Sequence, residues 1–199
     1  MVAVGASTGG PQALKVLLPR LPAAFPLPIL LVQHITPGFE EGFADWLDRS
    51  GPLRVRLARS GDDLIPGQVL VAPAGTHLEL DPSCRVLLTQ APPEHGVRPA
   101  ASVLFRSVTR RFGGDAAAVL LSGMGTDGAQ EMRLLRDRGG TTFAQDAPSS
   151  LIWGMPGEAV RLAGAEQVLP PERIAAALAA LARRPDEDDA PPREGGTKP

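Results

Sequence analysis

The hydrophobic positions of this chain fall into short runs that suit strands, separated by longer amphipathic stretches that suit helices. The strand-like runs span residues 2–4, 28–33, 116–121, 141–145 and 167–169. Helix-length segments follow them at residues 11–21, 39–50, 129–138, 156–162 and in a last stretch that opens at Pro171. Two of the runs, PILLVQ and AAAVLL, do not alternate polar with apolar residues, as expected of parallel strands covered on both faces. The pattern predicts an α/β fold with a doubly wound, mainly parallel sheet, Rossmann-like and three-layered.

The middle of the chain and its end depart from this pattern. Residues 52–90 contain four short alternating pieces, at 54–58, 68–72, 77–80 and 86–88, with the turn signals PG and DPS between them. We expect them to form a small antiparallel β-hairpin insert. After Leu181 proline, glycine and charge replace apolar periodicity. The expected organisation is one domain over residues 1–183 and a disordered tail over 184–199.

Composition narrows the possible partners. The chain has 43% hydrophobic and 21% charged residues and a net charge of -2, and Lys15 and Lys198 are its only lysines, so no basic footprint for nucleic acid is present. No apolar run approaches the roughly 18 residues of a membrane span, and no basic segment precedes the first apolar run as in a secretory signal. Cys84 is the single cysteine, which fits a reducing compartment. We expect a cytoplasmic monomer that does not insert into membranes.

Three residues that could carry chemistry follow separate strand-like runs. Ser7 lies in the glycine-rich turn GASTGG, between the run at 2–4 and the first helix. His34, one of three histidines, directly follows PILLVQ, and Asp127 follows AAAVLL in the stretch SGMGTDG. Because the carboxyl ends of parallel strands meet at one edge of a sheet, where ligands bind, we expect these side chains to lie close together.

This combination predicts a nucleophile, a base and an orienting acid. A serine hydroxyl is almost fully protonated at neutral pH, so an imidazole must take its proton during attack on a carbonyl carbon. A carboxylate on the other ring nitrogen fixes the tautomer and stabilises the imidazolium. Glycines let a developing oxyanion approach backbone amides closely. For Asp127 alone, a helix cap or an Asp-Gly turn is the simpler interpretation.

Other candidates have weaker claims. Ser122 is a rival nucleophile without an adjacent base, and His77 is expected to be a hydrogen-bonded structural residue, with lining the site as the alternative. His95 is expected to be solvent-exposed, and Cys84 to be a packing or surface thiol. No metal site is predicted, because no two histidines have i, i+4 spacing and no CxxC occurs.

The turn itself allows two further interpretations. GASTG matches the G-x-S-x-G elbow of α/β-hydrolases, but in that fold several strands precede the elbow and the order is Ser, acid, His. A dinucleotide-binding turn would need G-x-G-x-x-G and an acidic residue after the second strand, where this chain has QHITPG. Both fit less well than a separate Ser-His-Asp site.

Six motifs in this order are similar to those of the catalytic domain of CheB-type chemoreceptor protein-glutamate methylesterases. They are GASTGG, VQHITPGF, VAPAGTHLEL, RPAASVLFRS, LLSGMGTDGAQEM and AQDAPSSLIWGMPGEAV, and the resemblance runs from Val2 to about Leu181. It implies Ser7 as nucleophile, His34 as base and Asp127 as acid, with the Met124 backbone amide as an oxyanion donor and Thr8 nearby.

The resemblance also implies a reaction. It is hydrolysis of γ-glutamyl methyl esters on the cytoplasmic helices of methylated chemoreceptors, with release of methanol, and in many members deamidation of receptor glutamines. Both are acyl transfers to water through an acyl-serine, so one triad serves both, and no cofactor is implied.

The chain departs from the family pattern in three places. Relatives commonly carry PSVDVLF where this chain has PAASVLF with Ser102, and PREA where it has PGEA with Gly157. We expect these changes to affect receptor recognition more than chemistry. Many relatives also have a receiver domain before the catalytic part, whereas residue 2 is here already in the first strand. We therefore expect a stand-alone catalytic domain whose cleft is open without a phosphodonor.

Two alternative functions remain: a receptor-binding module with impaired turnover, and a Ser-His-Asp esterase for another substrate.

Overall fold

A central sheet of seven parallel strands organises the computed structural model, which describes residues 1–182. Its order is β3-β4-β2-β1-β7-β8-β9, and a separate hairpin pairs β5 with β6. The strands are β1 (Val2–Ala6), β2 (Ile29–Gln33), β3 (Arg54–Leu57), β4 (Gln68–Val71), β5 (His77–Leu80), β6 (Val86–Thr89), β7 (Ala117–Leu120), β8 (Thr141–Gln145) and β9 (Gln167–Leu169). The helices are α1 (Gly10–Leu17), α2 (Glu40–Asp48), α3 (Ala101–Phe112), α4 (Ala129–Asp137), α5 (Met155–Arg161) and α6 (Pro171–Leu181), with short 3-10 turns at Leu18–Arg20 and Gly113–Asp115.

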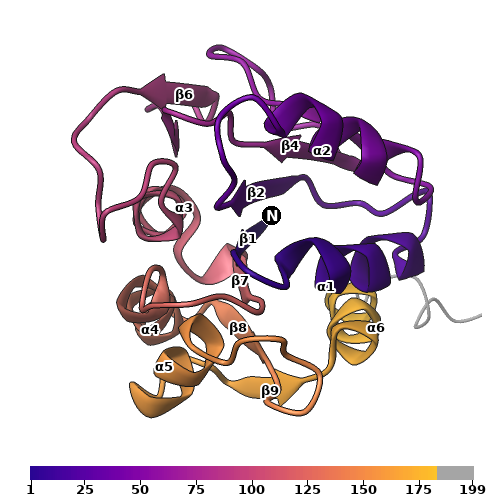
Figure 1. Cartoon of the computed structure of the whole chain (residues 1–199), viewed down its shortest axis with the longest axis vertical. Helices are drawn as coiled ribbons and strands as arrows, with labels where there is room; N and C mark the ends of the chain where they lie inside the picture. Colours follow the sequence, from indigo (N-terminus) through magenta and orange to yellow (C-terminus); the bar gives the residue numbers. More distant parts are fainter. Residues whose placement is uncertain (183–199) are drawn as a thin grey trace, which may run out of the picture.

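Helices cover both faces of the sheet (Figure 1). Helices α1, α2 and α6 pack on one face against a cluster that includes Val4 and Leu31. Helices α3, α4 and α5 pack on the other face against a cluster that includes Ala3 and Leu30. Because successive residues of a strand point to opposite faces, the neighbours Leu30 and Leu31 enter different cores. This confirms the doubly wound α/β fold and explains why PILLVQ is apolar throughout.

The region 52–90 corrects part of the sequence interpretation. Only β5 and β6 form the antiparallel hairpin, whereas β3 and β4 are parallel strands of the main sheet. Strand β3 is the outermost strand, with Arg54 exposed and Val55 buried. An edge strand keeps a polar-apolar alternation, which is why its sequence resembles a hairpin strand.

Helix α3 was not among the elements expected from the sequence. Its buried residues include Ala101, Leu104, Phe105 and Val108, which have the i, i+3, i+4, i+7 spacing of a helix with one apolar face. The helix lies between the sheet and the hairpin, and it packs against both β5 and α4. The missed helix matters because its first turn contacts the candidate site.

Two expectations concern the rest of the chain. The expected boundary at 183 and the expected tail at 184–199 lie outside the described residues. None of the helices between residues 1 and 182 has the length and apolar character needed to cross a membrane.

Candidate active site

The sheet brings the three predicted residues to one edge, at the point where its strand order reverses. From β1 the chain passes to β2 on one side, and it later returns to β7 on the other side. Ser7 follows β1, His34 follows β2, and Asp127 lies in the loop between β7 and α4. The carboxyl edge at such a reversal is where open α/β sheets bind ligands.

Ser7 occupies a tight turn into α1. Its backbone N–H donates to the Ser122 carbonyl at 3.0 Å, and its own carbonyl accepts from the Gly10 N–H at 2.8 Å. Gly9 has a φ of 84°, which favours glycine at this position. Ser7 is half-buried, and within residues 1–182 its hydroxyl forms no hydrogen bond. The turn fixes the backbone and leaves the hydroxyl free to meet a substrate.

His34 stands beside Ser7 in the sheet register. The ladder between β1 and β2 ends with Ala6 opposite Gln33, and the His34 N–H donates to the Ala6 carbonyl at 2.9 Å. Neighbouring strands lie about 4.8 Å apart, so the next residue on each strand projects from adjacent backbones. The register thus places Ser7 and His34 on adjacent strands at the same edge, while within residues 1–182 no hydrogen bond joins their side chains.

Asp127 holds the far nitrogen of the imidazole. The distance from His34 Nε2 to Asp127 Oδ2 is 2.8 Å, and the two side chains are 13% and 3% exposed. A carboxylate accepts hydrogen bonds, so in neutral His34 the hydrogen lies on Nε2. The bare nitrogen is then Nδ1, which is the atom available to take a proton.

Two backbone amides at the start of α3 also bind Asp127. Ala101 N–H donates to Oδ2 at 2.6 Å and Ser102 N–H donates to Oδ1 at 2.9 Å. Burial raises the pKa of Asp127, but the hydrogen bonds from His34 and Ser102 outweigh it, so the pKa of Asp127 lies below its ordinary value. Asp127 precedes α4, yet the helix that it caps is α3, whose N-terminal amides favour a negative charge.

Of the two expected oxyanion residues, Thr8 lies in the Ser7 turn and Met124 lies in the loop between β7 and α4. Within residues 1–182, neither Thr8 nor Met124 uses its backbone N–H in a hydrogen bond. A Cβ built on Gly123 would lie 2.8 Å from the Ser7 Cβ, so the segment before Met124 touches the nucleophile turn. The Met124 side chain is 69% exposed and contributes little to packing.

Ser122 is a structural residue. It is fully buried, and its hydroxyl donates to the Thr8 carbonyl at 2.7 Å and accepts from the Ile152 N–H at 3.0 Å. These bonds join the loops that follow β1, β7 and β8. Because its hydroxyl is buried and engaged on both sides, Ser122 is a poor nucleophile.

His77 also has a structural place. It is fully buried on the hairpin; Ala100 N–H donates to its Nδ1 at 3.2 Å and its Nε2 donates to the Pro92 carbonyl at 3.1 Å. Ala100 immediately precedes α3, so His77 supports the helix that binds Asp127 rather than lining the site.

The remaining two candidates lie on the surface or close to it. His95 is exposed, as expected, and Cys84 is half-buried in the turn between β5 and β6.

The two altered family motifs have different surroundings. Ser102 is fully buried; its hydroxyl accepts from the Gly128 N–H at 2.8 Å, so the residue supports Asp127 from behind. The expectation that Ser102 concerns receptor recognition is therefore wrong, because a residue at this depth cannot contact a receptor. Gly157 lies under Trp153, where a Cβ would stand 3.0 Å from the indole ring.

Sequence reasoning missed two buried glutamines that end strands. Gln33 donates from Nε2 to the carbonyls of Ser7 and His34. Gln145 accepts from the Ser122 N–H at 2.7 Å and donates to the Ser149 carbonyl at 2.8 Å. A polar residue at the end of an otherwise apolar buried strand was the signal that could have identified both.

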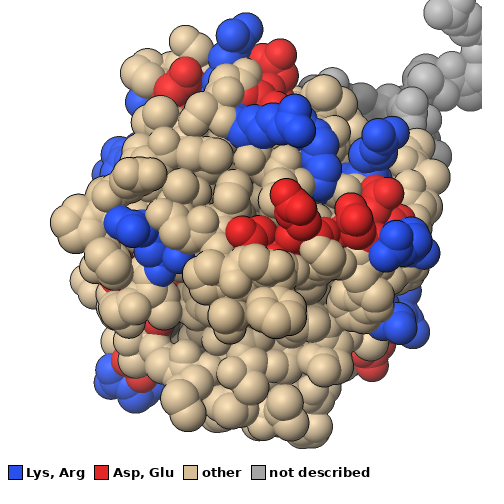
Figure 2. All heavy atoms as spheres, turned by 45° about the horizontal axis from the view of Figure 1, so that its top comes forward, with Lys and Arg blue, Asp and Glu red and all other residues tan. Residues whose placement is uncertain are grey.

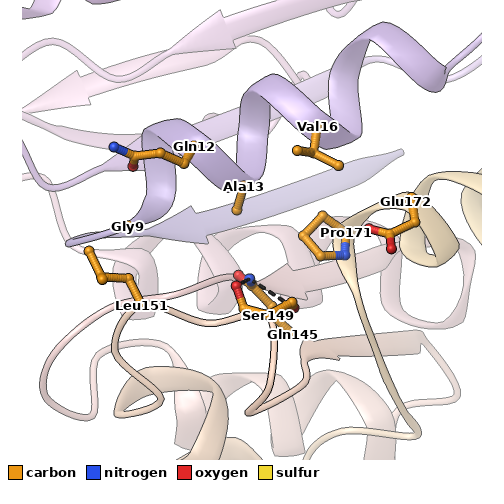
Figure 3. A pocket seen from close by; sticks show the side chains of 9 residues that line it. All are labelled: Gly9, Gln12, Ala13, Val16, Gln145, Ser149, Leu151, Pro171 and Glu172. Atoms are coloured by element: carbon orange, nitrogen blue, oxygen red, sulfur yellow. Dashed lines mark hydrogen bonds between the residues drawn. The ribbon is translucent and has the colours of Figure 1, made fainter.

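Exposed apolar side chains surround the Ser7 turn. They come from the loops after β2, β7 and β8 and are Phe39, Met124, Leu151 and Trp153. A groove of about 330 Å³ begins at Gly9, with α1 as one wall and the loop that carries Ser149 and Leu151 as the other (Figure 3). The surroundings of the site are thus open and largely apolar.

Charged groups of both signs are mixed on the surface. On the face in Figure 2, acidic side chains are flanked by basic ones, and much of the remaining surface is uncharged. Ion pairs such as Arg106–Glu94 and Arg133–Asp137 connect neighbouring groups. No extended basic area is visible on this face, in line with the net charge of -2.

Fold and site together define a doubly wound α/β protein with serine, histidine and aspartate at the reversal point of its sheet. The family model for the CheB methylesterase matches residues 2–178. The chain belongs to this family.

Individual proteins support the assignment. The chain is 54% identical over 181 residues to a protein-glutamate methylesterase/protein-glutamine glutaminase of Nitrosospira multiformis, covering 91% of this chain and 51% of that protein. It is 52% identical over 186 residues to protein-glutamate methylesterase/protein-glutamine glutaminase 3 of Anaeromyxobacter dehalogenans, covering 92% and 54%. The crystal structure of the Thermotoga maritima CheB methylesterase catalytic domain has a TM-score of 0.87 at 36% identity, covering 90% of this chain and 97% of that one. The chain spans about half the length of the curated relatives it matches.

Proposed function

We propose that this chain is a serine hydrolase that removes methyl esters from glutamate side chains of chemoreceptors. The observation that carries the proposal is the 2.8 Å hydrogen bond from His34 Nε2 to Asp127, one strand away from Ser7, in a chain of the CheB methylesterase family. The relatives are named as methylesterases and glutaminases. Deamidation of receptor glutamines is therefore part of the proposal.

The proposed mechanism has two halves. Ser7 Oγ attacks the ester carbonyl carbon while His34 Nδ1 takes the hydroxyl proton, and Asp127 stabilises the imidazolium. The imidazolium then gives the proton to the departing oxygen, which leaves as methanol. Water attacks the acyl-serine with its proton going to His34, and collapse of that adduct returns the proton to Ser7 and releases glutamate. With a glutamine substrate the leaving group is ammonia.

Backbone amides are proposed to stabilise the oxyanion. The free N–H groups of Met124 and Thr8 support this role, because both flank Ser7 and neither has a partner among residues 1–182. Loss of one such donor costs on the order of 3 kcal/mol of barrier in other hydrolases. The reaction needs only water as co-substrate, and we propose no cofactor.

The open apolar surroundings favour a protein substrate. Phe39 and Leu151 are 66% and 70% exposed on opposite sides of the Ser7 turn, which suits contact with a helix surface that presents one side chain to the serine. We propose the cytoplasmic helices of methylated receptors as the partner, which places the reaction in the cytoplasm.

The test is release of volatile methanol from receptor membranes whose glutamates carry radioactive methyl groups. The purified chain is expected to release methanol, and the Ser7→Ala variant is the matched control. Binding to the membranes without methanol release would favour a receptor-binding module. Hydrolysis of simple methyl esters without receptor turnover would favour an esterase with another substrate.

A further inference from the structure

Gln33 connects the two residues whose approach the proposed reaction needs. It is the last residue of β2 and is 3% exposed. Its Nε2 donates to the Ser7 carbonyl at 2.9 Å and to the His34 carbonyl at 2.9 Å. Both hydrogens of the Gln33 amide are thus donated to backbone carbonyls, one of the proposed nucleophile and one of the proposed base.

Within residues 1–182, no backbone hydrogen bond joins Ser7 directly to His34. The ladder between β1 and β2 ends one residue earlier, with the bond from the His34 N–H to the Ala6 carbonyl. Among residues 1–182, the Gln33 amide is the only group that hydrogen-bonds both. The Gln33 side chain therefore adds a connection between the two loops beyond the ladder, next to the bonds that Ser122 and Gly10 form with the Ser7 backbone.

The oxygen of the same Gln33 amide lowers the stability of the fold. Gln33 Oε1 is buried and has no hydrogen-bond partner in the described part of the chain, residues 1–182. An unpaired buried acceptor is destabilising, and an apolar side chain of equal length would not have this defect. Turning the amide over would place Oε1 against two carbonyl oxygens. The observed orientation is thus the one that satisfies both carbonyls and leaves Oε1 unsatisfied.

Gly10 makes room for the amide. A Cβ built on Gly10 would collide with Gln33 Oε1 and would lie 2.7 Å from the Ala6 Cβ. Gly10 is the first residue of α1, and its N–H already binds the Ser7 carbonyl. The space around Gln33 is therefore set by the same turn that carries Ser7.

We propose that Gln33 is a positioning residue that holds the backbones of Ser7 and His34 side by side, so that the hydroxyl and the imidazole can come within proton-transfer distance when substrate binds. The proposal rests on the proposed function. Proton transfer needs heavy atoms about 2.6–3.2 Å apart, and among the described residues the Ser7 side chain forms no hydrogen bond that would set this distance by itself. A displacement of about 1 Å can cost on the order of 10²-fold in turnover.

The first test compares Gln33→Met with Gln167→Met, a control in which an exposed glutamine of the edge strand β9 is replaced. Methionine keeps the length and removes both donors. We expect kcat for methanol release to fall on the order of 10²-fold in Gln33→Met, with KM within about threefold. Thermal stability is expected to fall only modestly, because removal of the unpaired Oε1 offsets part of the loss of the two bonds. The control is expected to match the wild type in all three quantities.

The second test uses charge. Gln33→Glu places carboxylate oxygens against both carbonyls, and we expect a larger loss of kcat than in Gln33→Met. Protonation restores one donor, so the ratio of variant to wild-type kcat is expected to rise as pH is lowered. A purely structural role would make the melting temperature of Gln33→Glu rise in parallel with kcat as pH is lowered, whereas a positioning role predicts recovery of kcat at pH values where the melting temperature does not change.

The third test covers the case in which Gln33→Met does not fold. Gly10→Ala leaves Gln33 in the chain and displaces its amide, so the same loss of kcat with unchanged KM is expected.

The outcomes distinguish failure of the positioning role of Gln33 from failure of the proposed function. If wild-type protein releases methanol and Gln33→Met keeps kcat within twofold, the positioning role is overturned and the proposed function stands. A fall in kcat that follows a fall in thermal stability, with no pH-dependent recovery in Gln33→Glu, also overturns it. If wild-type protein releases no methanol, both proposals fail together.

Discussion

The two sides of the candidate site are built in different ways. On the Asp127 side, the buried carboxylate accepts three hydrogen bonds, from His34 and from the first turn of α3. On the Ser7 side, the hydroxyl has no partner within residues 1–182, and free amides of Thr8 and Met124 stand beside it. The Asp127 carboxylate is thus held in place in the free protein, whereas the Ser7 hydroxyl and the Thr8 and Met124 amides remain available for hydrogen bonds to substrate.

The difference follows from what each group does in the proposed reaction. A charge that must stabilise an imidazolium works best when its donors are already oriented, because no reorganisation is needed during the reaction. A nucleophile and its oxyanion donors must remain open to the substrate carbonyl. The comparison therefore predicts large effects on turnover at the Ser7 side and combined effects on turnover and stability at the Asp127 side.

The largest effect is expected from removing the nucleophile. Ser7→Ala should lower methanol release by several orders of magnitude and leave the unfolding free energy nearly unchanged, because the lost hydroxyl forms no hydrogen bond within residues 1–182. The Ser7→Ala/His34→Ala double variant should be hardly worse than either single variant, since the members of such a group act together. Near-normal release by Ser7→Ala would disprove the nucleophile and direct attention to Ser122.

Asp127→Asn is expected to have the next largest effect. The introduced asparagine side chain is uncharged, and its NH₂ group is a donor facing the three donors that bind the Asp127 carboxylate in the wild type. His34 Nε2–H then lacks a reliable acceptor, so the imidazole is no longer held in one tautomer. Turnover should fall on the order of 10²- to 10⁴-fold, less than in Ser7→Ala. Unlike Ser7→Ala, this variant should also unfold at a lower temperature. Full activity would reduce Asp127 to a cap of α3.

Ser102→Ala tests the support behind the acid. It leaves the Gly128 N–H buried without its acceptor, and we expect about 1–3 kcal/mol less unfolding free energy, measured by denaturant titration. Turnover should fall only a fewfold because the Ser102 backbone bond to Asp127 remains. Ser83→Ala, in an exposed turn, is the control. Equal stability of the two variants would show that the Ser102 hydroxyl is dispensable.

The smallest effect concerns stability at acid pH. The folded pKa of Asp127 lies below the ordinary value of about 3.9, so its carboxylate stabilises the fold above that pH. This contribution should disappear as pH falls through the lowered pKa. We expect the difference in unfolding free energy between wild type and Asp127→Asn to be constant near neutral pH and to shrink below about pH 4. A difference independent of pH would contradict the pKa direction.

Most of the fold could be predicted from periodicity alone. The runs around Val4 and Leu31 are buried on both faces, and such strands have an unmistakable pattern. The errors arose where burial is one-sided. Strand β3 alternates because it is an edge strand, and α3 was missed although Leu104 and Val108 show helical spacing. Whether an alternating strand pairs in the main sheet or in a hairpin depends on distant partners that no local pattern encodes.

The sequence predicted the three candidate catalytic residues but not the residues that hold them in position. Ser7, His34 and Asp127 follow strands that pair with one another or share a neighbour, so their position in the chain was informative. The roles of Gln33 and Ser102 depend on hydrogen bonds to backbones 26 residues away. Such contacts become visible only when the strands are placed side by side.

The claim that the Asp127 side is complete without substrate can be tested most directly by nitrogen-15 NMR of histidine-labelled protein. The chain has three histidines, so a His34→Ala spectrum assigns the signal. We predict that neutral His34 carries its hydrogen on Nε2 in the free protein, in Ser7→Ala as in wild type, and that Asp127→Asn loses this preference. His77 serves as an internal reference, because its bonds to Ala100 and Pro92 require the same tautomer. A hydrogen on Nδ1 of His34 in the free wild-type protein would contradict the account.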